Sequence, residues 1–186
     1  MTLAETALPP SQETRAVLIA AASIAILAAV WIFQGMGYEP CELCLTQRYA
    51  FYAVVPLALL TALASRSAHG LARAGFALLA LVFAASAVLA AYHVGVEYHW
   101  WAGPTACTGG PGSLDVNDLV KALDSVKVVR CDEVQLRIAG LSLAGWNVVA
   151  SAVLAAYAAL GLFQESRAQA TLTALKSRLA LTALYV

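Results

Sequence analysis

Four long apolar runs divide the chain, and each is long enough to cross a lipid bilayer. They cover approximately residues 15–33, 45–64, 72–95 and 141–163. About 20 helical residues cross the roughly 30 Å of hydrocarbon in a bilayer. Each run has almost no ionisable side chain in its middle, so as a helix it satisfies its own backbone and leaves no charge in lipid. The pattern predicts an all-α membrane protein built as a four-transmembrane-helix bundle.

The composition supports a membrane protein. Of the 186 residues, 61% are hydrophobic and 12% are charged, which is too apolar for an ordinary soluble domain. The net charge is zero and the basic residues are scattered, which argues against a nucleic-acid partner. The first run follows a polar stretch rather than a basic one, so we interpret it as a retained helix and not as a signal peptide. We therefore expect an N-terminal segment (1–14), a four-helix domain (15–163) and a C-terminal tail (164–186).

Basic residues set the expected orientation. The connection between the second and third runs and the C-terminal tail are both basic, with Arg66, His69, Arg73, Arg167, Lys176 and Arg178. Lys and Arg concentrate in cytoplasmic segments, so both termini are expected in the cytoplasm. The connections at about 34–44 and 96–140 should then face the opposite side.

All four cysteines lie in those two connections. Cys41 and Cys44 end the first, whereas Cys107 and Cys131 lie in the second. The first and third connections of a four-span protein always share a side, so the two pairs can meet whatever the orientation. If that side is the periplasm of a bacterial inner membrane, disulfides form and persist there.

The spacing of Cys41 and Cys44 places both thiols in the first turn of the second helix, after Pro40. The unpaired N–H groups at a helix N-terminus favour a thiolate over a thiol. A CxxC is also half of a zinc site, but zinc sites usually have a second closely spaced pair, and Cys107 and Cys131 are 24 apart. We therefore favour a redox-active pair and expect no metal.

Two further residues are candidates for binding an electron acceptor. Arg48 follows Cys44 by four residues, so it lies one turn deeper on the same helix face. It either snorkels to the lipid headgroups or, as we favour, stabilises Cys44 as a thiolate and donates to a quinone carbonyl. His93, near the end of the third run, is either an interfacial polar residue or a second donor to the quinone.

The long connection between Cys107 and Cys131 is expected to carry a short amphipathic helix on the membrane surface. Its apolar residues recur at helical spacing at Val116, Leu119, Val120, Leu123 and Val126. A disulfide here could simply staple the loop. Alternatively, a flexible loop could carry that disulfide between a large partner and Cys41.

With these residues, the chain resembles the bacterial disulfide bond formation protein B (DsbB) family over nearly all of residues 15–163. The resemblance depends on the segments Cys41-Glu-Leu-Cys44, Gln47-Arg48-Tyr49, Gly103-Pro104-Thr105-Ala106-Cys107 and Gly140-Leu141-Ser142 after Cys131.

The resemblance implies a membrane thiol:quinone oxidoreductase that reoxidises a periplasmic, DsbA-like thioredoxin-fold protein. Two electrons would pass through Cys107 and Cys131, then through Cys41 and Cys44, to ubiquinone or menaquinone. Cys44, Arg48 and His93 would contact the quinone. The alternatives are a quinone reductase similar to vitamin K epoxide reductase, and a non-enzymatic membrane scaffold whose cysteines are structural or bind zinc.

Overall fold

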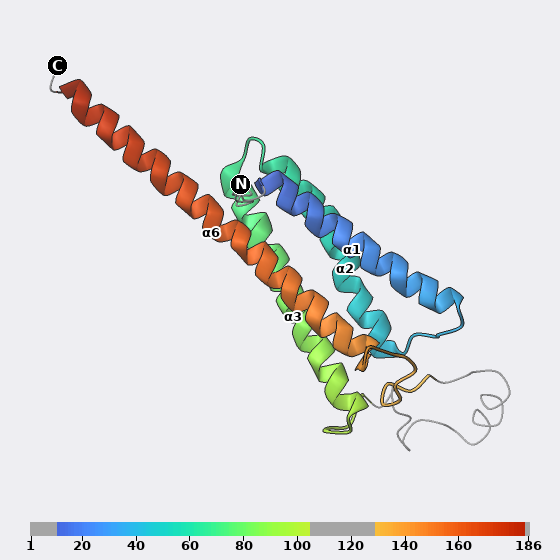
Figure 1. The fold of residues 1–186 in the computed structure, drawn as a ribbon. Helices are drawn as coiled ribbons and strands as arrows, with labels where there is room; N and C mark the ends of the chain where they lie inside the picture. The colour runs from blue at the N-terminus through green and yellow to red at the C-terminus, as the bar shows by residue number, and fades with distance from the viewer. Residues whose placement is uncertain (1–10, 105–128, 185–186) are drawn as a thin grey trace, which may run out of the picture.

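The computed structural model describes residues 11–104 and 129–184, and in the last helix it describes side chains as far as residue 163. In chain order the elements are α1 (Gln12–Gly35), α2 (Glu42–Ala64), α3 (His69–Glu97), β1 (Arg137–Ile138), β2 (Leu141–Ser142) and α6 (Leu143–Leu184) (Figure 1).

The prediction of four transmembrane helices is confirmed. The helices α1, α2 and α3, and the Leu143–Phe163 part of α6, are each long and apolar enough to cross a membrane. The ends of the first three lie within three residues of the predicted runs.

Beyond the membrane span, α6 continues without a break to Leu184 and projects from the bundle (Figure 1). The expected domain boundary at residue 164 therefore falls inside a single helix. Most of the N-terminal segment and the expected amphipathic helix between Cys107 and Cys131 lie outside the described residues.

The four helices pack as a ring in which one neighbouring pair, α1 and α6, is less closely packed than the others. The extensive contacts are α3 with α6, α1 with α2, and α2 with α3, whereas α1 and α6 share the smallest contact of the four neighbouring pairs. Small side chains let the helices approach closely, and the core includes Ala16, Ala20, Ala58, Ala62, Ala72 and Ala158. Larger side chains fill the remaining core, where Phe51 and Phe83 meet edge to face with ring centroids 5.9 Å apart.

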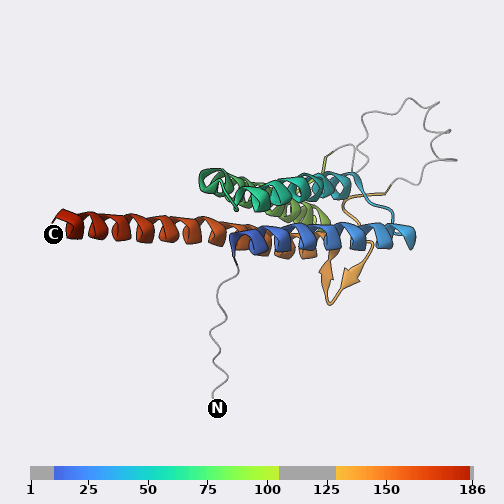
Figure 2. The same cartoon turned by 90° about the horizontal axis from the view of Figure 1, so that it is seen from above.

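A small, mostly exposed hairpin lies at the end of the bundle where α2 begins and α3 ends, and it projects to one side (Figures 1 and 2). Its strands pair Arg137 with Ser142 and Ile138 with Leu141. The two turn residues, Ala139 and Gly140, have φ of 50° and 85°, the left-handed conformation that a tight two-residue hairpin turn requires.

Ser142 joins this hairpin to two helices. Its hydroxyl donates to a carboxylate oxygen of Glu97, 2.5 Å away, and accepts from the backbone N–H of Gly145 at 3.1 Å. It therefore caps the start of α6 while tying it to the end of α3. This fixes the segment that follows Cys131.

We expect Gly161→Ala to destabilise the bundle. A Cβ at Gly161 would lie 2.6 Å from the Cδ1 atom of Phe76, and Phe76 is fully buried. Overpacking typically costs about 1–3 kcal/mol, which opposes the roughly 1 kcal/mol that Ala gains over Gly in a helix. Thermal unfolding of the detergent-solubilised protein should show a lower midpoint.

Gly70→Ala in α3 is the matched control, because a Cβ there meets nothing within 4 Å. Its midpoint should stay unchanged or rise. Equal midpoints for the two variants would contradict the close contact between α3 and α6 at Phe76.

Candidate functional site

The start of α2 gives Cys41 a particular role. Cys41 is the N-cap residue, with extended backbone, and its sulfur accepts the backbone N–H of Cys44 at 3.3 Å. The two sulfur atoms lie 3.0 Å apart, and both thiols are free. Pro40 precedes the cap rather than occupying the first helical position. The sulfur that accepts a hydrogen bond from a backbone N–H in the first turn of α2 is therefore that of Cys41.

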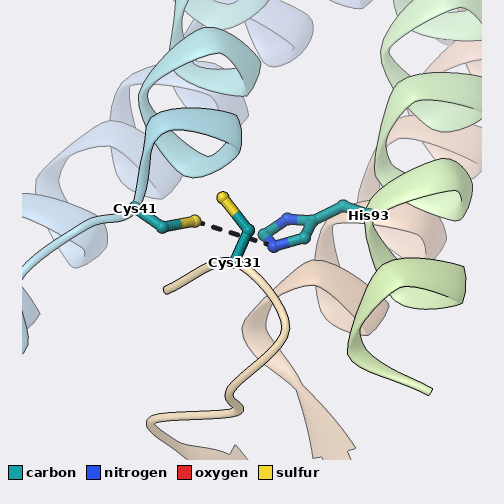
Figure 3. Close-up of side chains that lie close together, drawn as sticks. All are labelled: Cys41, His93 and Cys131. Carbon is teal, nitrogen blue, oxygen red and sulfur yellow. Dashed lines mark hydrogen bonds between the residues drawn. The ribbon is translucent and has the colours of Figure 1, made fainter. Parts of the chain in front are cut away.

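Two other elements bring His93 and Cys131 to the same sulfur (Figure 3). The Nε2 atom of His93 lies 3.6 Å from Sγ of Cys41. The potential ligand atoms of Cys41, His93 and Cys131 all lie within 4.8 Å of one another, and at most 5% of any of these residues is exposed. Cys131 is disulfide-bonded, whereas Cys107 lies outside the described residues. Members of both cysteine pairs thus lie at one end of the bundle.

This environment favours a thiolate at Cys41. Its hydrogen bond with Cys44 is the main cause that lowers the pKa of Cys41, burial opposes the shift, and the hydrogen bond with His93 adds to the lowering. The net direction is a pKa well below that of an ordinary cysteine.

Two hydrogen-bonded amides, the buried Gln47 and the half-buried Asn147, support His93 on the side away from Cys41. Nε2 of Gln47 lies 2.9 Å from Nδ1 of His93, and Nδ2 of Asn147 donates to Oε1 of Gln47 at 2.5 Å. Neither amide was among the residues expected from the sequence. The available signal was their position, since polar residues inside a membrane span usually face the bundle interior.

Arg48 is held at the seam between α1 and α2. Its Nη1 donates to Oε1 of Gln34 at 2.8 Å, and its guanidinium carbon lies 5.7 Å from the centre of the Trp31 ring. Its partners are thus residues of α1. Arg48 also lines the cavity that adjoins Cys41 and Cys44.

A cavity of about 380 Å³ adjoins both free thiols. It lies between α1 and α6, where the ring of helices is loosest, and loop residues 130–136 help to close it. Its polar lining includes Cys41, Cys44, Gln47, Arg48, His93, Glu97 and Asn147, and its apolar lining includes Ile26, Leu27, Val30, Phe33, Ala144 and Ala150. The structure thus brings all the described candidate residues except Cys131 onto one cavity wall.

The same cluster offers little to a metal ion in the state described. Cys41, His93 and Cys131 have the right proximity for three ligands, but the sulfur of Cys131 is committed to a disulfide. Within this group one thiol and one imidazole remain, fewer than the four ligands of a structural zinc site.

Comparisons with known proteins agree with this geometry. The family model described as "Disulfide bond formation protein DsbB" matches residues 12–161. Three relatives are named disulfide bond formation protein B. Those of Saccharophagus degradans, Herminiimonas arsenicoxydans and a Polaromonas species are 31%, 30% and 29% identical, over 78%, 75% and 74% of this chain and 89%, 87% and 83% of their own length. No solved structure gives a significant match.

The matched region begins at the start of α1 and ends within α6, so it contains the first three spans, nearly all of the fourth, the capped CxxC and the segment that brings Cys131 to it. The chain belongs to the DsbB family of disulfide bond formation proteins, membrane oxidoreductases that act in disulfide formation.

Proposed function

We propose that the chain oxidises the dithiol of a DsbA-like thioredoxin-fold protein in the periplasm and passes two electrons to a membrane quinone, ubiquinone or menaquinone. The observation that carries this proposal is the proximity of two sulfur atoms. Sγ of Cys41, beside the free thiol of Cys44, lies within 4.8 Å of the sulfur of disulfide-bonded Cys131. Thiol–disulfide exchange requires such an approach.

The exchange steps balance with four cysteines, starting from Cys107–Cys131 and Cys41–Cys44 disulfides. A partner thiolate attacks Cys107 and releases Cys131 as a thiolate, which attacks Cys41 and releases Cys44. The second partner thiol then resolves the mixed disulfide and releases Cys107, which attacks Cys131 and frees Cys41. The partner leaves oxidised, and Cys41 and Cys44 hold its two electrons as thiols.

The state described here corresponds to that last stage, because Cys41 and Cys44 are free while Cys131 is disulfide-bonded. Reforming the Cys41–Cys44 bond would release two electrons and two protons, and a bound quinone would supply the acceptor for both.

The cavity fits a quinone in its chemistry. Helix α1 and the start of α6 supply apolar walls for a flat ring. Arg48 and His93 line the same cavity as Cys44, so they are the residues that would donate to the carbonyl oxygens. Quinone contact with Cys44 places the acceptor next to the thiol that must be oxidised.

The proposed orientation has the cysteine end in the periplasm of a bacterial inner membrane and both termini in the cytoplasm. It is supported by the basic residues between α2 and α3, at the end of the bundle opposite the cysteines. One of them, Arg66, pairs with Glu13 near the start of α1. In the periplasm a disulfide relay can persist and meet a secreted partner.

Cys44→Ser should abolish quinone consumption, because a hydroxyl cannot form the disulfide with Cys41. The assay follows loss of quinone absorbance after addition of a reduced DsbA-type protein. Thr46→Val is the matched control on the same helix turn, since among the described residues its hydroxyl bonds only the local carbonyl of Glu42, at 3.0 Å. Quinone loss at the wild-type rate in Cys44→Ser would contradict the relay.

Arg48→Ala should raise the KM for quinone about tenfold or more, because a hydrogen bond to a charged group contributes about 1.5–3 kcal/mol. Arg66→Ala is the control, since that arginine is exposed at the opposite end of the bundle. Steady-state kinetics with a short-chain quinone measure both. An unchanged KM in Arg48→Ala would refute the assigned quinone contact.

A further inference from the structure

We propose that Gln47 and Asn147 are positioning residues that hold His93 in the tautomer with its proton on Nε2, so that Nε2–H points at the sulfur of Cys41. The assignment of this tautomer depends only on hydrogen bonds within the helix bundle. Only its catalytic consequence rests on the proposed function.

The donor and acceptor in each of these hydrogen bonds can be assigned in turn, starting from α6. The Ser151 hydroxyl donates to Oδ1 of Asn147 at 3.1 Å, so the oxygen of that amide is already accepting. The Asn147 NH₂ group donates to Oε1 of Gln47 at 2.5 Å. The NH₂ group of Gln47 is therefore the part of its amide that faces Nδ1 of His93, 2.9 Å away.

A ring nitrogen that accepts a hydrogen bond carries no proton, and a neutral imidazole has one N–H. With Nδ1 accepting from Gln47, the proton must lie on Nε2, 3.6 Å from Sγ of Cys41.

This tautomer has two chemical consequences for Cys41. A donated N–H stabilises the thiolate, which is the form that attacks or leaves in disulfide exchange. The opposite tautomer would turn a nitrogen lone pair towards the sulfur and favour the thiol. The same proton occupies Nε2, so in this tautomer Nε2 has no lone pair to offer a metal ion.

Nitrogen-15 NMR of the full-length protein in detergent tests the tautomer directly. The imidazoles are labelled, the pH is set where they are neutral, and His69→Gln and His99→Gln variants identify the other two histidines. His93 should show an unprotonated Nδ1 and a protonated Nε2. A protonated Nδ1 in the wild type would overturn the proposal.

Asn147→Asp should reverse the tautomer. A carboxylate can only accept, so Gln47 must turn its NH₂ group towards it and its oxygen towards Nδ1 of His93, which then takes the proton. The hydrogen bond from Ser151 is kept. An unchanged His93 spectrum in this variant would contradict the positioning role of Asn147.

The pH profile of Cys41 alkylation is the second readout. Reduced protein, with neither partner nor quinone, is treated with limiting iodoacetamide, and fragment mass spectrometry separates Cys41 from Cys44. The lowered pKa of Cys41 means that its thiolate persists below neutral pH. In Gln47→Met and Asn147→Asp the midpoint should rise by about one pH unit, a roughly tenfold loss of thiolate below the midpoint.

Gln47→Met introduces no charge, so its shift separates the lost hydrogen bond from the added carboxylate of Asn147→Asp. Thr46→Val should leave the profile unchanged. The other titratable or charged groups that line the cavity with Cys41 are Tyr38, Glu39, Cys44, Arg48, His93, Glu97, Arg130 and Glu133. Cys131, whose thiol is free in the reduced protein, lies beside Cys41 as well, and all of these groups are retained in these variants. An unshifted profile in Gln47→Met would overturn the positioning role, whereas failure of quinone reduction would count only against the proposed function.

Discussion

In the relay we propose, the sulfur of Cys41 must carry negative charge where little water reaches it, so it needs hydrogen-bond donors from the protein. Cys41 is 5% exposed. Its donors come from two residues: Cys44, through its thiol and its backbone N–H, and, in the tautomer we propose, His93 through its imidazole. Both can be supplied only if the first turn of α2 and the last turns of α3 meet at the same depth. The lengths of α2 and α3 and their close packing place these turns at the same depth.

The connection that carries Cys131 meets the same constraint by a different route. The described residues that follow Cys131 are fixed at their far end, where the hairpin leads into Ser142 and Ser142 binds both Glu97 and the start of α6. The disulfide sulfur is thereby brought beside Cys41, and the described residues 129–136 around it form neither helix nor strand. Such an arrangement suits a group that, in the relay we propose, exchanges bonds both with the partner and with Cys41.

The sequence predicts the spans well because twenty apolar residues in a row have few alternatives, and it places the CxxC at a helix start. It does not predict which sulfur is the cap, because that depends on a one-residue difference in where α2 begins. It also leaves open the partners of Gln47 and Arg48. The spans are apolar on nearly every face, so periodicity does not reveal how each helix is rotated, and only packing decides that Gln47 meets His93 while Arg48 meets Gln34.

The four helices contribute unequally to the site. The hydrogen-bonded side chains Gln47, His93 and Asn147 lie on α2, α3 and α6, and the contacts α3–α6 and α2–α3 are extensive. Close packing of these helices matters here, because a misplaced amide would leave polar groups unsatisfied. Helix α1 supplies no cysteine and neither of those two amides. It contributes an apolar cavity wall and, through Gln34 and Trp31, the position of Arg48. Its looser contact with α6 therefore leaves space beside Cys44 without disturbing the hydrogen bonds that hold Cys41 reactive.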